Sequence, residues 1–105
     1  MPITLSHLAQ KDLSEIREYT VERWGRDQWF RYFRGLVNAF EAIAENPEKG
    51  RERSLFYSGM RSVNYEMHVI FYMRIAANDG EPVILRIVHQ KRNMPALVYY
   101  EDLER

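Results

Sequence analysis

The apolar residues of this chain change their spacing once, after Asn46-Pro47. Before that point they recur every three or four residues, as they do on one face of an α-helix. After it, bulky side chains fall into short segments of β character that polar turns separate. The sequence therefore predicts two layers, with helices packed against a sheet.

Two helices are predicted before the change in spacing. The first is expected to stop at Gly25, because glycine is favoured just past a helix end. Its apolar face consists of Ala9, Leu13, Ile16, Thr20 and Trp24. The second is expected to be capped by Asp27 and to end at Asn46-Pro47. Its apolar face consists of Trp29, Phe33, Leu36, Phe40 and Ile43. The link between them is two or three residues long, which predicts an antiparallel hairpin.

Strands are predicted on both sides of the helices. A short one over residues 3–6 is expected first, with Ser6 as the cap of the first helix. Residues 47–53 are polar and are predicted to be a loop. Three more strands are predicted, over residues 60–65, 68–76 and 83–88. The sequence Asn78-Asp79-Gly80 indicates a hairpin turn between the last two.

These elements predict an α+β fold in the order β-α-α-β-β-β. A helical hairpin is expected on one face of a mainly antiparallel sheet, and residues 1–105 are expected to form a single domain. The segment over residues 68–76 carries bulky side chains on both faces, so we expect it inside the sheet.

Composition narrows the class of protein. The chain has no cysteine, which excludes a disulfide framework and favours a reducing cytoplasm. Its 15 basic and 15 acidic residues balance, and a neutral chain is a poor candidate for direct nucleic-acid binding. No signal peptide is evident, and no apolar stretch approaches the roughly 18 residues of a membrane helix. We therefore expect a cytoplasmic protein without membrane contact.

Cofactor and metal sites are not expected. The three histidines are far apart in the sequence, and none has a second ligand at a metal-binding spacing. The five glycines form no phosphate-binding loop.

One group of residues does suggest chemistry. Arg61, Arg86 and His89, with Tyr65 and Tyr72 as aromatic neighbours, contain the base and the cations that a metal-independent ribonuclease needs. On a regular strand, however, residues 86 and 89 point to opposite faces, and they share a site only if a bulge separates them. No second acid or base is evident nearby. In the structural alternative, Arg86 pairs with a carboxylate and His89 bonds a backbone group.

A series of short motifs, in their order and spacing, resembles the RelE/ParE toxin superfamily and within it the ParE branch, over residues 3–94. The motifs are Asp12-Leu13, Ile16 and Tyr19, Trp24-Gly25, Asn46-Pro47 with Gly50, Gly59-Met60-Arg61, the segment from His68 to Tyr72, and Arg86 to His89 before Met94. The segment from Gln90 to Met94 departs from the shorter basic or acidic sequence that is usual before that methionine. This part of ParE-like toxins is implicated in the inhibition of DNA gyrase, so the departure bears on how strongly the chain inhibits that enzyme.

The resemblance implies the fold above and the toxin half of a bacterial type II toxin–antitoxin module. ParE-like toxins inhibit DNA gyrase by protein contact and are neutralised by a ParD-like antitoxin, so no catalytic residue is expected. RelE-like toxins instead cut mRNA on the ribosome, and in that alternative Arg61, Arg86 and His89 are the catalytic candidates. A third alternative is a toxin fold that only binds its antitoxin. RelE-like nucleases are strongly basic, whereas this chain is neutral with three lysines, which favours the ParE branch.

Residues at the edges of the apolar faces and near the last strand are the candidates for partner contact. An amphipathic helix or an extended segment of an antitoxin could dock on such flanks. In the alternative, these side chains complete the core. The residues expected to contact a partner are Leu8, Tyr19, Phe30, Tyr32, Arg61, Tyr72, Lys91, Arg92 and Met94.

Overall fold

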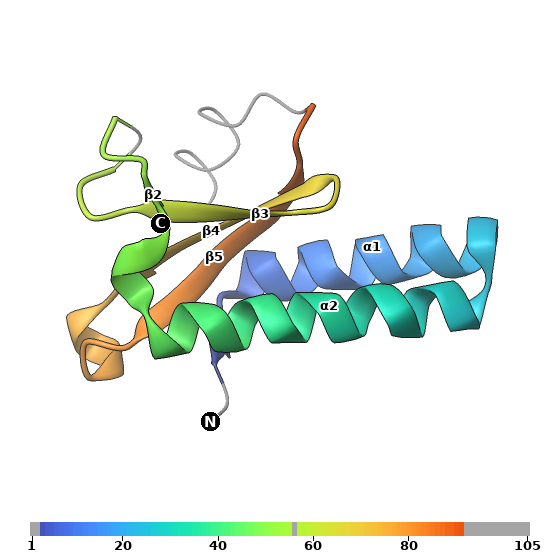
Figure 1. Cartoon of the computed structure of the whole chain (residues 1–105), viewed down its shortest axis with the longest axis horizontal. Helices are drawn as coiled ribbons and strands as arrows, with labels where there is room; N and C mark the ends of the chain where they lie inside the picture. Colours follow the sequence, from blue (N-terminus) through green and yellow to red (C-terminus); the bar gives the residue numbers. More distant parts are fainter. Residues whose placement is uncertain (1–2, 56, 92–105) are drawn as a thin grey trace.

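A computed structural model, which describes residues 3–55 and 57–91, has helices on one face of a five-stranded sheet (Figure 1). The helical hairpin consists of α1 (His7–Trp24) and α2 (Arg26–Glu45). The strands are β1 (Thr4–Leu5), β2 (Arg51–Glu52), β3 (Arg61–Tyr65), β4 (His68–Arg74) and β5 (Pro82–His89). Two short 3-10 helices, η1 (Pro47–Lys49) and η2 (Ala76–Asn78), lie between them. The predicted α+β architecture is confirmed.

The sheet has the strand order β1-β5-β4-β3-β2. Strands β2 to β5 pair with their neighbours antiparallel, and β1 pairs with β5 parallel. The prediction that β4 lies inside the sheet is confirmed. The loop predicted over residues 47–53 is wrong in part, because it contains η1 and β2. Strand β2 consists of two exposed charged residues, Arg51 and Glu52, and has no apolar alternation that would reveal it.

The helix ends follow local chemistry. The hydroxyl of Ser6 accepts a hydrogen bond from the backbone N–H of Ala9 at 3.0 Å, as predicted for the cap of α1. Gly25 ends that helix with φ of 92°, a conformation that glycine adopts without steric cost. The predicted cap at Asp27 is wrong, because α2 begins one residue earlier, at Arg26. Asp27 lies in the first turn, where its carboxylate still complements the helix dipole.

The core has two parts, one on each face of the sheet. The helix-side part is formed by Ala9, Leu36, Phe40, Ile43, Ile70, Tyr72, Ile84 and Ile87. The part on the opposite face is formed by Met60, Val69, Phe71, Val83, Leu85 and Val88. The prediction that Trp24 belongs to the core is wrong, and its side chain is exposed. In Figure 1 the hairpin runs well past the sheet, so no strand lies beneath that end of α1.

Two glycines allow tyrosines to approach the backbone closely. A Cβ atom at Gly35 would lie 1.8 Å from the hydroxyl oxygen of Tyr65, so α2 packs against β3 only because residue 35 has no side chain. At Gly50 the added atom would lie 2.2 Å from the hydroxyl of Tyr72. That hydroxyl accepts a hydrogen bond from the Gly50 N–H and donates one to the carbonyl of Pro47. Tyr72 thereby fixes η1 to the sheet.

A buried ion pair joins the first helix to the last strand. The guanidinium of Arg86 donates from Nε and Nη2 to the two carboxylate oxygens of Asp12, at 2.8 and 2.9 Å. The same carboxylate accepts the backbone N–H of Ile87 at 2.9 Å. The side chains of Arg86 and Asp12 are only 3% and 7% exposed. Arg86 is thus held in a structural pair with a carboxylate.

Replacing Asp12 by leucine should lower the free energy of unfolding by about 3–5 kcal/mol, because it leaves the Arg86 cation without its carboxylate. The double variant Asp12→Leu, Arg86→Met removes both charges, and we expect it to regain part of that loss. Urea unfolding followed by circular dichroism measures both changes. Equal midpoints for the wild-type and Asp12→Leu chains would contradict the structural role of this pair.

Candidate partner-binding site

The residues proposed for nuclease chemistry do not converge. Arg61 donates to the carbonyl of Gly50 at 2.8 Å and pairs with Glu48 at 3.2 Å, while Arg86 is buried against Asp12. A β-bulge does occur in β5, but it lies at Leu85, ahead of Arg86. From Arg86 to His89 the pairing with β4 is regular. The bulge therefore does not bring Arg86 and His89 to the same face.

His89 instead belongs to a cluster of aromatic and imidazole rings. It lies directly opposite His68 in the sheet, and the two ring centroids are 5.6 Å apart. His68 in turn makes a short hydrogen bond through Nδ1 to the hydroxyl of Tyr32, and the ring of Tyr32 contacts that of Tyr65. We call these four residues the Tyr–His cluster. It connects α2, through Tyr32, to strands β3, β4 and β5.

Burial is the main cause of the pKa shifts of Tyr32, Tyr65 and His68 in this cluster. Burial, and secondarily the nearby His89, lowers the pKa of His68 to about 4. The His68 ring is therefore neutral at pH 7, and it shares a hydrogen bond through Nδ1 with the Tyr32 hydroxyl. Burial also raises the pKa of Tyr32 and of Tyr65, so both phenols keep their protons.

His89 is not poised to act as a base. Its Nδ1 accepts the backbone N–H of Lys91 at 3.2 Å, which is the backbone bond that the structural alternative predicted. Within residues 3–55 and 57–91, no three His, Asp, Glu or Cys residues form a group that could hold a metal ion.

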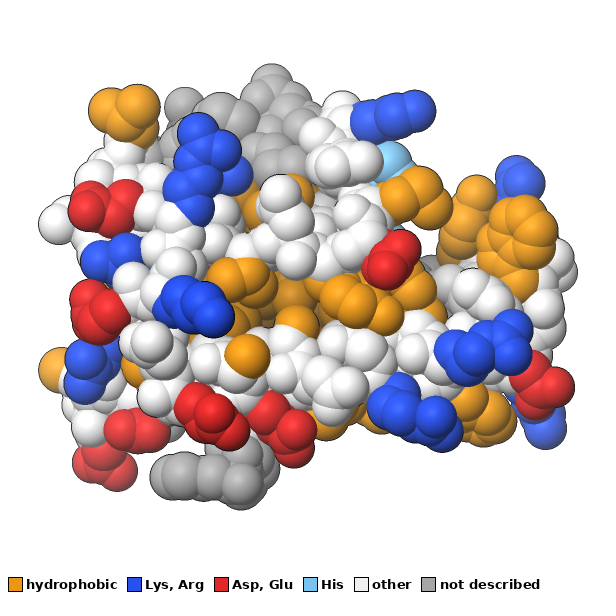
Figure 2. Space-filling view, in the orientation of Figure 1, with side chains coloured by type: hydrophobic (Ala, Val, Ile, Leu, Met, Phe, Trp, Pro, Cys, Tyr) orange, Lys and Arg blue, Asp and Glu red, His pale blue; other side chains and the backbone are white. Residues whose placement is uncertain are grey.

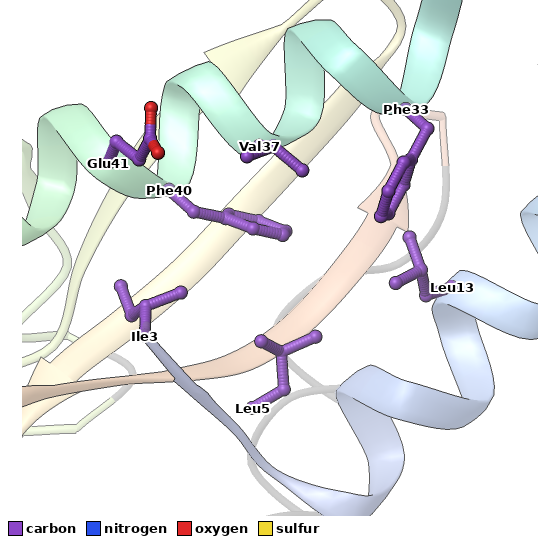
Figure 3. Close-up of a pocket in the computed structure, with 7 residues that line it drawn as sticks. All are labelled: Ile3, Leu5, Leu13, Phe33, Val37, Phe40 and Glu41. Carbon is purple, nitrogen blue, oxygen red and sulfur yellow. The ribbon is translucent and has the colours of Figure 1, made fainter. Parts of the chain in front are cut away.

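An apolar recess lies between the hairpin and β1 (Figure 3). It has a volume of about 220 Å³. Its lining residues are Ile3, Leu5, Leu13, Phe33, Val37, Phe40 and Glu41. In Figure 3 the apolar side chains converge on the cavity, and the carboxylate of Glu41 points away from it. A recess of this kind can accept an apolar side chain of a partner.

The residues expected to contact a partner have different environments. Tyr19, Phe30 and Lys91 are exposed, whereas Leu8 is half-buried. Tyr72 is only 1% exposed and its hydroxyl is bonded within the chain, so its side chain is not part of a contact surface.

Other residues that were predicted to contact a partner are bonded within the molecule or lie outside the part of the chain that the structure describes. Tyr32 is half-buried in the Tyr–His cluster, and Arg61 is paired with Glu48. Arg92 and Met94 lie outside the described residues.

The recess was not predicted, because it is formed by three elements whose mutual placement the sequence pattern does not fix.

The fold and these surfaces define a small α+β protein-binding domain. A family model described as the ParE toxin of the type II toxin–antitoxin system parDE matches residues 3–94, and the chain belongs to this family. It is a toxin of the ParE type. ParE toxins act by binding other proteins and not by catalysis.

Bacterial relatives agree with this assignment. "Toxin ParE1" of Mycobacterium tuberculosis is 34% identical over 90 residues, which cover 86% of this chain and 90% of the relative. "Toxin ParE1" of Caulobacter vibrioides is 36% identical over 95 residues, or 90% of this chain and 95% of the relative.

A solved structure shares the fold. A chain of the "Chromosomal ParDE TA system from P. aeruginosa" superimposes with a TM-score of 0.70 at 20% identity, covering 85% of this chain and 95% of that one.

No helix within residues 3–55 and 57–91 has the length and apolar character that crossing a bilayer requires.

The Tyr–His cluster predicts a dependence of stability on pH. The pKa of folded His68, about 4, is below its ordinary value of 6.5, so between these values the unfolded chain binds more protons. Stability contributed by neutral His68 should be present above pH 6.5 and should be lost as the pH falls toward 4. Urea unfolding of wild-type and His68→Asn chains across this range measures the difference. His7→Asn, at an exposed position, is the control and should keep the wild-type slope. Identical slopes for the wild-type and His68→Asn chains would contradict this assignment.

Proposed function

We propose that this toxin acts in the cytoplasm by inhibiting DNA gyrase through direct contact, and that a ParD-like antitoxin neutralises it. The observation that carries the proposal over a RelE-like ribonuclease is the separation of Arg61, Arg86 and His89. Two of these side chains are held in ion pairs, and Nδ1 of the third accepts the backbone N–H of Lys91. A ribonuclease would need a base and an acid placed around one phosphate.

The apolar recess supports an antitoxin partner. Leu13 of α1 and Val37 and Phe40 of α2 surround a space that an apolar side chain of an amphipathic antitoxin helix would fill. Concave sites lined mainly by apolar side chains are the usual places where ligands and partner side chains bind. The antitoxin is expected to be the product of a reading frame immediately upstream.

Two assays distinguish the three alternatives. Purified toxin, added to gyrase and supercoiled plasmid, should trap cleaved DNA, and it should leave ribosome-bound mRNA intact. Sequence-specific cuts in the mRNA, with gyrase unaffected, would overturn the proposal in favour of a RelE-like nuclease. Inactivity in both assays, with antitoxin binding retained, would indicate a chain that only binds its antitoxin.

The recess is tested by filling it. Val37→Arg places a long cation in the apolar space and should weaken antitoxin binding by more than about tenfold. Asn38→Arg adds the same charge at the next, exposed position of α2 and should leave binding unchanged. Isothermal titration calorimetry measures the two dissociation constants, and circular dichroism verifies that both variants are folded. Equal affinities would show that the recess is not the antitoxin site.

A further inference from the structure

The end of the helical hairpin carries aromatic side chains that the fold does not use. We call residues 17–34 the hairpin tip; most of it extends beyond the sheet in Figure 1. Tyr19, Trp24 and Phe30 are 59%, 67% and 56% exposed. Large aromatic side chains gathered on one exposed element are a property of interaction surfaces, whereas a single exposed apolar residue is ordinary.

Arginines surround these rings. The tip contains five of them, and all are exposed: Arg17, Arg23, Arg26, Arg31 and Arg34. The guanidinium of Arg23 lies over the ring of Tyr19, 5.0 Å from its centroid, in a cation–π contact. In Figure 2 Lys, Arg and apolar side chains dominate the free end of the hairpin, and most acidic side chains lie over the other half.

This charge distribution does not stabilise α2. The first half of the helix carries Arg26, Arg31 and Arg34 against the single acidic Asp27, and the second half carries Glu41 and Glu45. A helix is stabilised by acidic residues near its N-terminus and basic residues near its C-terminus, which is the opposite order. Arg26, in the first turn of α2, is therefore placed against this preference, whereas Arg23, in the last turn of α1, agrees with it.

We propose that the hairpin tip is a second docking surface, which binds a carboxylate-rich patch on the protein that this toxin attacks. Tryptophan, tyrosine and arginine are the residues that contribute most to protein–protein affinity, and the tip exposes all three types, with Arg23 stacked on Tyr19 and Trp24 at the end of α1. Arginine binds carboxylates through paired hydrogen bonds. The partner surface that fits these arginines is therefore acidic.

Nucleic acid is the less suitable occupant. Glu18, Glu22 and Asp27 are interleaved with the arginines and are exposed. A phosphate backbone would meet these carboxylates with unrelieved repulsion, because it carries a negative charge at every nucleotide. A protein surface can place its own cations opposite them. The tip meets the recess only at Phe33, so the two surfaces can be altered independently.

The first experiment rests on the proposed gyrase target. The double variant Arg26→Glu, Arg31→Glu and the single variant Trp24→Ala should each bind gyrase more than about tenfold more weakly than the wild-type toxin, and bind the antitoxin unchanged. Arg51→Glu, a charge reversal at an exposed position of β2, is the matched control and should bind both partners normally. If wild-type toxin binds gyrase and the tip variants bind it equally well, the tip proposal is overturned and the gyrase proposal stands.

A second experiment needs no gyrase. The chain has two tryptophans, so in a Trp29→Phe variant the emission reports on Trp24 alone. At low salt, a glutamate-rich peptide that also contains lysines, which can lie opposite Glu18, Glu22 and Asp27, should shift this emission to the blue, and adding Arg26→Glu and Arg31→Glu should abolish the shift. If the wild-type toxin does not bind gyrase, the gyrase proposal fails and this titration alone decides the tip. No shift, or a larger shift with duplex DNA at the same concentration of charge, would then overturn the proposal.

Discussion

Asp12 and Arg86 are 74 positions apart in the sequence, and their ion pair holds the first helix against the last strand. The carboxylate of Asp12 also binds the backbone N–H of Ile87, at an edge of β5 that β1 does not reach, since β1 pairs only with Val83 and Ile84. The hydroxyl of Ser6 takes up the next position along this edge by donating to the carbonyl of Leu85 at 2.7 Å. Side chains of the first helix and its cap thus complete a hydrogen-bonding pattern that a longer strand would otherwise supply. The register of β5, the placement of the hairpin and the burial of the helix-side core all depend on these bonds.

The same pair explains why a group that resembles a catalytic site in the sequence is not one in the structure. An arginine three positions before a histidine suggests a phosphate clamp, but this arginine is committed to holding the fold together. The buried pair between α1 and β5 supplies stability, whereas the recess between the hairpin and β1 and the exposed rings of the hairpin are surfaces that a partner can reach. This division suits a toxin that works by contact, because contact residues on the helices can change without disturbing the buried pair.

Periodicity was sufficient to predict the two layers, the hairpin and the interior position of β4, because those features follow from where apolar side chains recur. Predictions from periodicity failed at individual residues. Asp12 occupies a core position as a charged residue, which a search for apolar spacing does not find. Trp24 has core spacing but lies beyond the end of the sheet. The pairing of His68 with His89 depends on the extra residue at Leu85, and counting back from the turn without that bulge would place His68 opposite Val88.

The two outer strands, β1 and β2, are each two residues long. A sheet recruits another chain by offering a long row of unpaired backbone groups at its edge. On one flank β2 pairs only with Arg61 and Ser62, so the open edge there consists of β2 and the last three residues of β3, Val63 to Tyr65. The side of β5 that β1 leaves open is occupied by Ser6 and Asp12. The toxin can therefore present its apolar recess and its aromatic rings to partners while exposing only short stretches of strand edge. Its sheet is a poor template for the cross-β aggregation to which small proteins rich in β-structure are prone.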